Sequence, residues 1–189
     1  MGDYFVSSII IDDFLQDFDG FRSHLDGVDY DGITNPEDGV FYPGVSLDIL
    51  PSVKAEVIER LQSKFGQSII PGAMFLRLSP LNVPTPHQAH TDPTMGEFGM
   101  MLYVNRLEDC MGGTSFENPI NEAQRLIWER DTNQTNSWGV LDICSMKPNR
   151  AMIFNTSLMH RSEPVGGFGK GAEDGRLVLV FFFDAEAGQ

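Results

Sequence analysis

The sequence predicts an α+β fold that is mainly β, with helices near the N-terminus and a jelly-roll-like barrel after them. Apolar residues recur at helical spacing in the first third of the chain. From residue 67 onward, short apolar runs alternate with turn-forming residues. Many short strands at such spacing are typical of a sandwich or barrel. Helices that precede a set of strands usually pack on one face of the sheet, which favours an α+β arrangement.

The first third opens with a short β-rich run from Tyr4 to Ile11, which predicts a strand. Apolar residues at helical spacing follow between Phe14 and Leu25. Because acidic residues favour the first turn of a helix, Asp12 and Asp13 place the predicted helix start close to them.

Residues 28–50 are rich in Gly, Asp and Pro, which predicts loops with brief strands. A second helix is predicted after Pro51, and Gly66 is well placed to end it. Residues 121–130 are predicted to form a helical insert among the strands. The candidate strands of the barrel are Ala73–Leu78, Gly99–Val104, Thr114–Glu117, Trp138–Ile143, Ala151–Asn155 and Arg176–Phe183.

Length and composition predict one globular domain. The chain has 189 residues, of which 41% are hydrophobic and 21% charged. We expect residues 1–189 to form a single domain, with 1–66 as a helical and mixed support region and 67–189 as the jelly-roll core. The formal net charge of −14 disfavours nucleic acid and anionic membranes as partners. The apolar run Leu177–Phe183 is too short to span a bilayer.

The two cysteines bear on the compartment. Cys110 and Cys144 do not form a C-x-x-C pair, so a thiolate zinc site is not predicted. The N-terminal segment lacks the basic stretch and cleavage site of a signal peptide. Free thiols and a cytoplasmic location are therefore expected. The sequence makes no prediction of oligomeric state.

A histidine and an aspartate lie two residues apart at a predicted strand end. Residues i and i+2 of a strand point to the same face, so His90 and Asp92 should project together. A third metal ligand could arrive from a distant strand, and His160 is the only later histidine. An H-x-D pair alone is a weak signal, because a lone histidine at a strand end is more often simply hydrogen-bonded.

Two histidines and one carboxylate on one face of a metal form the facial triad that is typical of non-heme Fe(II) oxygenases. Three protein ligands leave three positions open. Two of these suit the 2-oxo and carboxylate oxygens of 2-oxoglutarate, and the third suits O2. The sequence thus predicts an iron site made by His90, Asp92 and His160.

The far carboxylate of 2-oxoglutarate needs a buried cation, and a planar guanidinium meets it with two hydrogen bonds. Arg176 starts an otherwise apolar strand, where a charge would be costly unless it were paired. A dicarboxylate co-substrate would pair it. The alternative is that Arg176 is a solvated residue at a strand edge.

Six stretches in this order make the sequence resemble the 2-oxoglutarate/Fe(II)-dependent dioxygenase superfamily, and most closely its prolyl-hydroxylase-like branch. They are His90–Asp92, Met101–Asn105, Gly112–Phe116, Lys147–Phe154, His160–Val165 and Gly175–Phe183. The resemblance covers about residues 73–183. It implies a double-stranded β-helix, a jelly-roll or cupin-like barrel, with iron near one mouth.

By this resemblance, His90, Asp92 and His160 look like iron ligands and Arg176 looks like the partner of the C5 carboxylate. Tyr103 falls where related hydroxylases place a tyrosine that reaches the same carboxylate, although an ordinary strand aromatic is the alternative. The implied activity is hydroxylation of a C–H bond in an amino-acid, peptidyl or other small-molecule substrate. It would release succinate and CO2, with ascorbate as a candidate reductant.

Two segments are longer than in compact prolyl hydroxylases, 117–146 and 164–175. Both are interpreted as lids, and their length leaves the prolyl substrate open. Two other functions compete with the oxygenase. One is a non-catalytic, cupin-like metal-binding or sensing module, which would not need Arg176. The other is a zinc hydrolase with the same three ligands, although no H-E-x-x-H motif is present.

Overall fold

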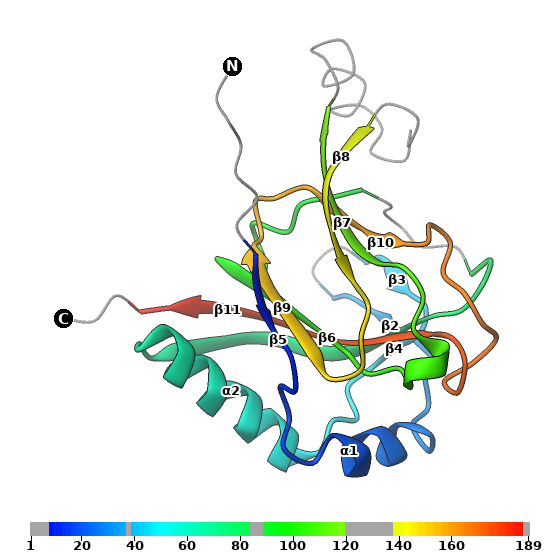
Figure 1. The fold of residues 1–189 in the computed structure, drawn as a ribbon, viewed down its shortest axis with the longest axis horizontal. Coiled ribbons are helices and arrows are strands. Elements are labelled where there is room, and N and C mark those ends of the chain that lie inside the picture. The colour runs from blue at the N-terminus through cyan, green and yellow to red at the C-terminus, as the bar shows by residue number, and fades with distance from the viewer. Residues whose placement is uncertain (1–7, 37–38, 84–88, 120–137, 187–189) are drawn as a thin grey trace.

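The computed structural model describes residues 8–36, 39–83, 89–119 and 138–186 (Figure 1). Of the three antiparallel sheets, the two larger ones lie one above the other in Figure 1, and two helices lie on the side of the largest sheet that faces away from the second. In chain order the elements are β1 (Ile9–Ile11), α1 (Phe18–Leu25), β2 (Ile33–Thr34), β3 (Phe41–Tyr42), β4 (Val45–Ser46), α2 (Pro51–Phe65), β5 (Ile69–Ser79), β6 (Phe98–Tyr103), the 3-10 turn η1 (Leu107–Asp109), β7 (Gly113–Pro119), β8 (Trp138–Ser145), β9 (Arg150–Asn155), β10 (His160–Glu163) and β11 (Arg176–Ala185). The predicted fold class, a mainly β double-stranded β-helix with flanking N-terminal helices, is confirmed.

The large sheet has the strand order β1-β9-β6-β11-β5-β4, and every neighbouring pair is antiparallel. β11 pairs with β6 on one side and β5 on the other, so the C-terminal strand is central to the sheet. β1 and β4 form its two edges. Residues from 1–66 therefore complete the sheet as well as support it. The small sheet has the order β10-β7-β8, and β2 pairs with β3.

The two faces of the large sheet contact different sets of residues. Successive residues of a strand point to opposite faces, and β11 shows this plainly. Its odd-numbered residues from Leu177 to Phe183 join a helix-side cluster with buried residues of α1 and α2. Its even-numbered residues from Val178 to Phe182 join an interior cluster with Phe116 of β7 and Cys144 of β8. The interior cluster therefore lies between the two sheets.

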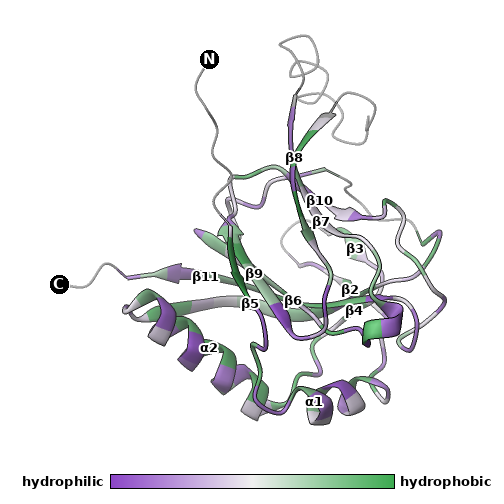
Figure 2. Ribbon diagram, in the orientation of Figure 1, coloured by the Kyte–Doolittle hydropathy of each residue, from purple (hydrophilic) through white to green (hydrophobic). Residues whose placement is uncertain are grey.

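The helices form as their sequences dictate. α2 has Pro51 at its first position and ends at Gly66, which has a left-handed φ of 65°. Its buried residues Val53, Val57 and Leu61 recur every four positions and form one apolar face. In Figure 2 hydrophobic residues concentrate in the strands of the large sheet, whereas both helices alternate hydrophilic and hydrophobic positions.

The first helix begins later in the chain than the sequence predicts. α1 begins at Phe18, and the side chain of Asp17 caps it by accepting a hydrogen bond of 3.0 Å from the Gly20 backbone N–H. Asp12 does not cap a helix. Its carboxylate instead accepts hydrogen bonds from Arg150 and Lys147 at the edge of the large sheet. This long-range ion pair has no local sequence signal.

The predicted strands all occur. One further strand, β10, was not predicted, although it contains a predicted metal ligand. β10 carries His160 and pairs with β7. The segment 164–175 is tied to the end of β5, because Phe168 donates its backbone N–H to Ser79 and Leu81 donates to Gly169. Its role as a lid stays a prediction. The predicted helical insert at 121–130 and most of 117–146 lie outside the described residues.

No helix among the described residues is long and apolar enough to cross a membrane.

Candidate metal centre

Backbone pairing places the two predicted histidine ligands side by side. His90 and His160 form an antiparallel bridge in which each backbone N–H donates to the other's carbonyl at 3.0 Å. Their ring centroids are consequently 4.6 Å apart. The N–H of Asp92 donates to the carbonyl of Thr156 at 2.9 Å, which fixes the carboxylate beside the same strand end. The structure thus brings together three residues that are separated by up to 70 positions in sequence.

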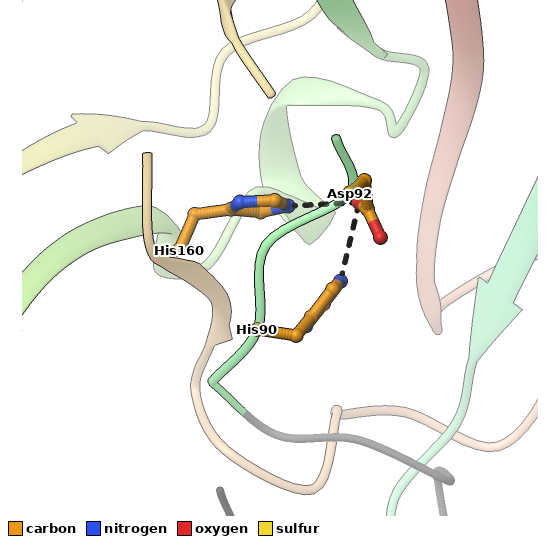
Figure 3. A group of neighbouring side chains, drawn as sticks. All are labelled: His90, Asp92 and His160. Carbon is orange, nitrogen blue, oxygen red and sulfur yellow. Dashed lines mark ion pairs between the residues drawn. The ribbon is translucent and has the colours of Figure 1, made fainter. Parts of the chain in front are cut away.

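The three side chains converge on one point, as Figure 3 shows. Asp92 Oδ2 lies 3.5 Å from His90 Nε2 and 3.5 Å from His160 Nε2. One ligand atom from each residue lies within 4.8 Å of the others. Ligands about 2.1 Å from an ion and at right angles to each other would be roughly 3 Å apart, so a small contraction would suit a shared ion. The arrangement fits a divalent metal.

The protonation states in the group suit metal binding. His160 is 1% exposed, and its Nδ1–H donates to the Leu158 carbonyl at 2.9 Å, which leaves Nε2 as the free lone pair. That Nε2 is buried and makes no hydrogen bond. Burial lowers the pKa of His160 and favours its neutral form. Burial tends to raise the pKa of Asp92, but the neighbouring His90 acts in the opposite direction, and the net pKa lies below its usual range.

A neutral imidazole with an unused Nε2 beside an ionised carboxylate is a donor set for a divalent cation. An unsatisfied polar atom in the interior costs free energy, and a metal ion would remove that cost. Phe154 packs edge-on against the His160 ring, with centroids 4.6 Å apart, and helps hold the ring in place. Within the part of the chain that the structure describes, His90, Asp92 and His160 are the residues grouped closely enough to hold a metal.

Arg176 lies at the start of β11 on the interior face and is 1% exposed. Its Nη2 donates to the Gly113 carbonyl at 3.1 Å and contacts Thr114 Oγ1 at 3.4 Å. Its Nε is buried without a hydrogen-bond partner. No carboxylate of the described residues lies within ion-pair distance of it. The structure therefore excludes the alternative of a solvated strand-edge residue.

Tyr103 is fully buried, and its hydroxyl lies 3.0 Å from Thr114 Oγ1 and 3.1 Å from the Cys144 carbonyl. Burial raises the pKa of Tyr103, so the phenol stays protonated and can donate. Burial also lowers the pKa of Arg176, yet the guanidinium remains charged at neutral pH. Thr114 thus joins Tyr103 to Arg176. Thr114 lies within the stretch Gly112–Phe116, but no sequence pattern predicts a role for it.

The sequence matches no protein-family model and no curated protein. Solved structures do match the fold. EctD from S. alaskensis with bound Fe has a TM-score of 0.54 at 14% identity, covering 94% of this chain and 72% of that one. HygX from Streptomyces hygroscopicus with iron bound has a TM-score of 0.55 at 13% identity, covering 94% and 82%. AviO1 from Streptomyces viridochromogenes Tue57 has 0.53 at 12%, covering 94% and 90%.

At these identities the likeness shows a shared fold. EctD has also been solved with 2-oxoglutarate and 5-hydroxyectoine, and HygX with nickel, 2-oxoglutarate and hygromycin B. The chain therefore has the fold of proteins solved with iron and 2-oxoglutarate, and it carries a His-Asp-His group.

Proposed function

We propose that this chain is a 2-oxoglutarate- and O2-dependent Fe(II) dioxygenase that hydroxylates a C–H bond of an amino-acid, peptidyl or other small-molecule substrate. One observation carries the proposal. His160, which groups with His90 and Asp92, packs on Phe154 of the interior cluster. Arg176 contacts the same cluster through Thr114 and Tyr103, and it is buried without an ion pair to a described carboxylate. An Fe(II) ion needs the first of these features and the dicarboxylate 2-oxoglutarate needs the second.

Fe(II) would be held by the Nε2 atoms of His90 and His160 and by the carboxylate of Asp92. The buried Nε2 of His160 supports this assignment, because nothing else among the described residues satisfies it. When bound there with 2-oxoglutarate, Fe(II) supplies the oxygen chemistry that yields succinate, CO2 and a hydroxylated product. Asp92 fills the third protein position, which favours hydroxylation over halogenation, since a halide would need that position.

Arg176 and Tyr103 would bind the C5 carboxylate of 2-oxoglutarate. The Arg176 Nε has an unused N–H, and the Tyr103 hydroxyl can turn from Thr114 to a bound carboxylate. Charge-assisted hydrogen bonds of this kind are short and strong in a dry interior. The carboxylate would also neutralise a charge whose burial is otherwise unfavourable.

The bound molecules of the fold neighbours support a small-molecule substrate. EctD was solved with 5-hydroxyectoine and HygX with hygromycin B. None of the three neighbours named above supports the prolyl-hydroxylase-like branch in particular, so that finer assignment rests on the sequence resemblance alone. A cytoplasmic location likewise stays a prediction.

The test uses anaerobic protein with Fe(II) and 2-oxoglutarate, followed by exposure to O2 with ascorbate as reductant. We expect one Fe(II) per chain, a visible charge-transfer band on adding 2-oxoglutarate, and release of succinate. His160→Ala should lose the metal and the band, because it removes a buried ligand. His24→Ala, which removes a histidine on α1, is the matched control and should keep both.

Arg176→Met separates the oxygenase from a non-catalytic metal-binding module. We expect it to keep Fe(II) and to raise the half-saturating 2-oxoglutarate concentration roughly 10- to 150-fold, the value of hydrogen bonds to a charged group. Arg22→Met, which removes a buried arginine on α1, should leave that concentration unchanged. Metal binding without any response to 2-oxoglutarate would support the module instead. Zinc in protein purified without oxygen would support the hydrolase.

A further inference from the structure

A second arginine lies on the interior face of the large sheet. On β5, Leu76 and Leu78 belong to the helix-side cluster, whereas Phe75 packs against the interior cluster. Arg77 lies between the two leucines in the strand, so its side chain is on the opposite face from theirs. It therefore lies on the same face as Phe75 and points into the barrel. No sequence pattern singles it out, because an arginine between two leucines also suits a half-exposed strand.

The cross-strand partners of Arg77 are apolar, and no described carboxylate pairs with it. Its partners across the two neighbouring strands are Val45 on β4 and Val178 on β11. No carboxylate of the residues described in this structure lies within ion-pair distance of its guanidinium. Burial lowers the pKa of Arg77, while the nearby Tyr42 acts in the opposite direction. A partly buried cation in such a setting is stabilised by a bound anion.

Arg77 and Arg176 are close enough to repel each other. Arg176 is directly opposite Ser79, so Arg77 is its diagonal neighbour on the adjacent strand. The Cα atoms of such diagonal neighbours are roughly 7–8 Å apart. The charge of Arg77 contributes to the lowered pKa of Arg176, after the larger effect of burial. Two guanidinium groups thus face one interior from adjacent strands.

A charge balance shows what is missing once the proposed co-substrates are bound. Fe(II) and the two guanidinium groups bring four positive charges, and neutral histidines add none. Asp92 and the two carboxylates of 2-oxoglutarate bring three negative charges. Glu163 also acts on Arg176, but it alternates with the inward-facing residues of β10 and is paired with Arg161. Among the groups that face the interior, one positive charge is therefore left over, and unpaired charge there is costly. Because 2-oxoglutarate would use Arg176 and the metal, the remaining cation is that of Arg77.

We propose that Arg77 binds a carboxylate of the primary substrate, so that the substrate is a small free acid rather than an internal residue of a peptide. This inference rests on the proposed function and names its substrate class. A carboxylate balances the single charge and can accept two parallel hydrogen bonds from one guanidinium. A phosphate dianion would instead leave a negative charge unpaired. An internal peptide residue has no main-chain carboxylate to offer.

The test measures binding to protein that is loaded anaerobically with Fe(II) and 2-oxoglutarate. The probes are free L-amino acids, N-acetyl-L-amino acids and short carboxylic acids, each compared with its carboxamide, together with inorganic phosphate and sulfate. Thermal shift and equilibrium binding are the readouts. We expect at least one acid to bind wild type about tenfold or more tightly than its amide, the value of a hydrogen-bonded charge pair.

Arg77→Gln should abolish that preference, and Arg77→Lys should keep part of it because it retains the charge. Arg60→Gln, on α2, where Arg60 pairs with Glu56 and contacts Phe14, is the matched control and should leave the preference unchanged. The proposal is overturned if wild type shows no preference for any acid, if phosphate or sulfate is preferred, or if Arg77→Gln keeps the preference.

The same samples report on the proposed function separately. The charge-transfer band and the half-saturating 2-oxoglutarate concentration should be the same in Arg77→Gln and wild type. A band that is missing in wild type contradicts the proposed function, whatever the acids do. A half-saturating concentration raised in Arg77→Gln as much as in Arg176→Met would make Arg77 a co-substrate residue and overturn the inference.

Discussion

The two faces of the large sheet differ in what their side chains do. On β11 the face toward the helices presents Leu177 and the three odd-numbered residues that follow, all apolar and fully buried. The interior face of the same strand begins with Arg176, and the strand beside it adds Arg77. The alternation of a strand thus separates a wholly apolar face from one that combines an apolar cluster with charged residues.

This separation has an energetic consequence. Packing apolar side chains between helices and sheet removes apolar surface from water, and this gain exceeds the side-chain entropy that is lost, so each contributes to stability. The interior instead contains the buried guanidinium of Arg176 and, from the small sheet, the buried imidazole of His160, and each has a nitrogen without a hydrogen-bond partner among the described residues. Such groups weaken the empty protein and strengthen the bound one. Substitutions on the two faces should therefore be distinguishable by which measurement they change.

The largest loss of stability is expected on the helix side. Leu179 is fully buried between Leu76 and Leu102, so Leu179→Ala leaves a cavity. We expect the free energy of unfolding to fall by about 2–5 kcal/mol, with turnover per folded molecule unchanged. Denaturant unfolding measures it, and Leu107→Ala at an exposed leucine should cost almost nothing. Equal losses in both variants would mean that the helix-side cluster does not carry the stability.

A smaller and different effect is expected on the interior face. Tyr103→Phe removes one hydroxyl that lies 3.0 Å from Thr114 Oγ1, without changing the ring. If the hydroxyl binds the co-substrate, the half-saturating 2-oxoglutarate concentration should rise about 2- to 10-fold. A loss of unfolding free energy with no change in that concentration would restore the alternative of a structural aromatic. Succinate release and denaturant unfolding on the same protein decide between them.

The smallest effect is expected at the sheet edge, away from both faces. The Arg150 hydrogen bond, together with Lys147, holds the pKa of Asp12 below its usual range. The contribution of this ion pair is therefore fully present above the unfolded pKa of about 3.9 and is lost as pH falls through the lower folded pKa. Asp12→Asn should lower the free energy of unfolding slightly at pH 7, as exposed pairs do.

Unfolding at several pH values checks this sign. The difference between wild type and Asp12→Asn should be constant near neutral pH and shrink below about pH 4. Salt at about 1 M should also reduce it, because exposed charges are screened. A difference that grows on acidification would contradict the assignment.

Sequence patterns located elements well where the signal was local. Pro51 and Gly66 marked the ends of α2 because both act through their own backbone dihedrals. The first helix was misplaced because Asp12 and Asp17 both suit a cap, and only the tertiary structure gives Asp12 to Arg150. Strand β10 was missed because its four polar residues, His160–Glu163, lack an apolar pattern.

The residues of the site could likewise be predicted where the sequence signal was local. His90, Asp92 and His160 were predicted as one group from spacing, order and resemblance, and the backbone bridge between the histidines places them together. Thr114 and Arg77 gained roles only in the structure. Both act through neighbours on other strands, which no local pattern specifies.

By itself the sequence determined the alternation of apolar and polar positions, the ends of α2 and the set of residues able to hold a metal, because these depend on nearby residues and on chemical type. Tertiary structure alone decided which strands pair and in what register. That pairing closes the barrel and leaves two guanidinium groups facing its interior. The physical reason is that strand pairing joins residues that are far apart in the chain. Side chains from different strands therefore come to face the same interior only after the sheets have formed.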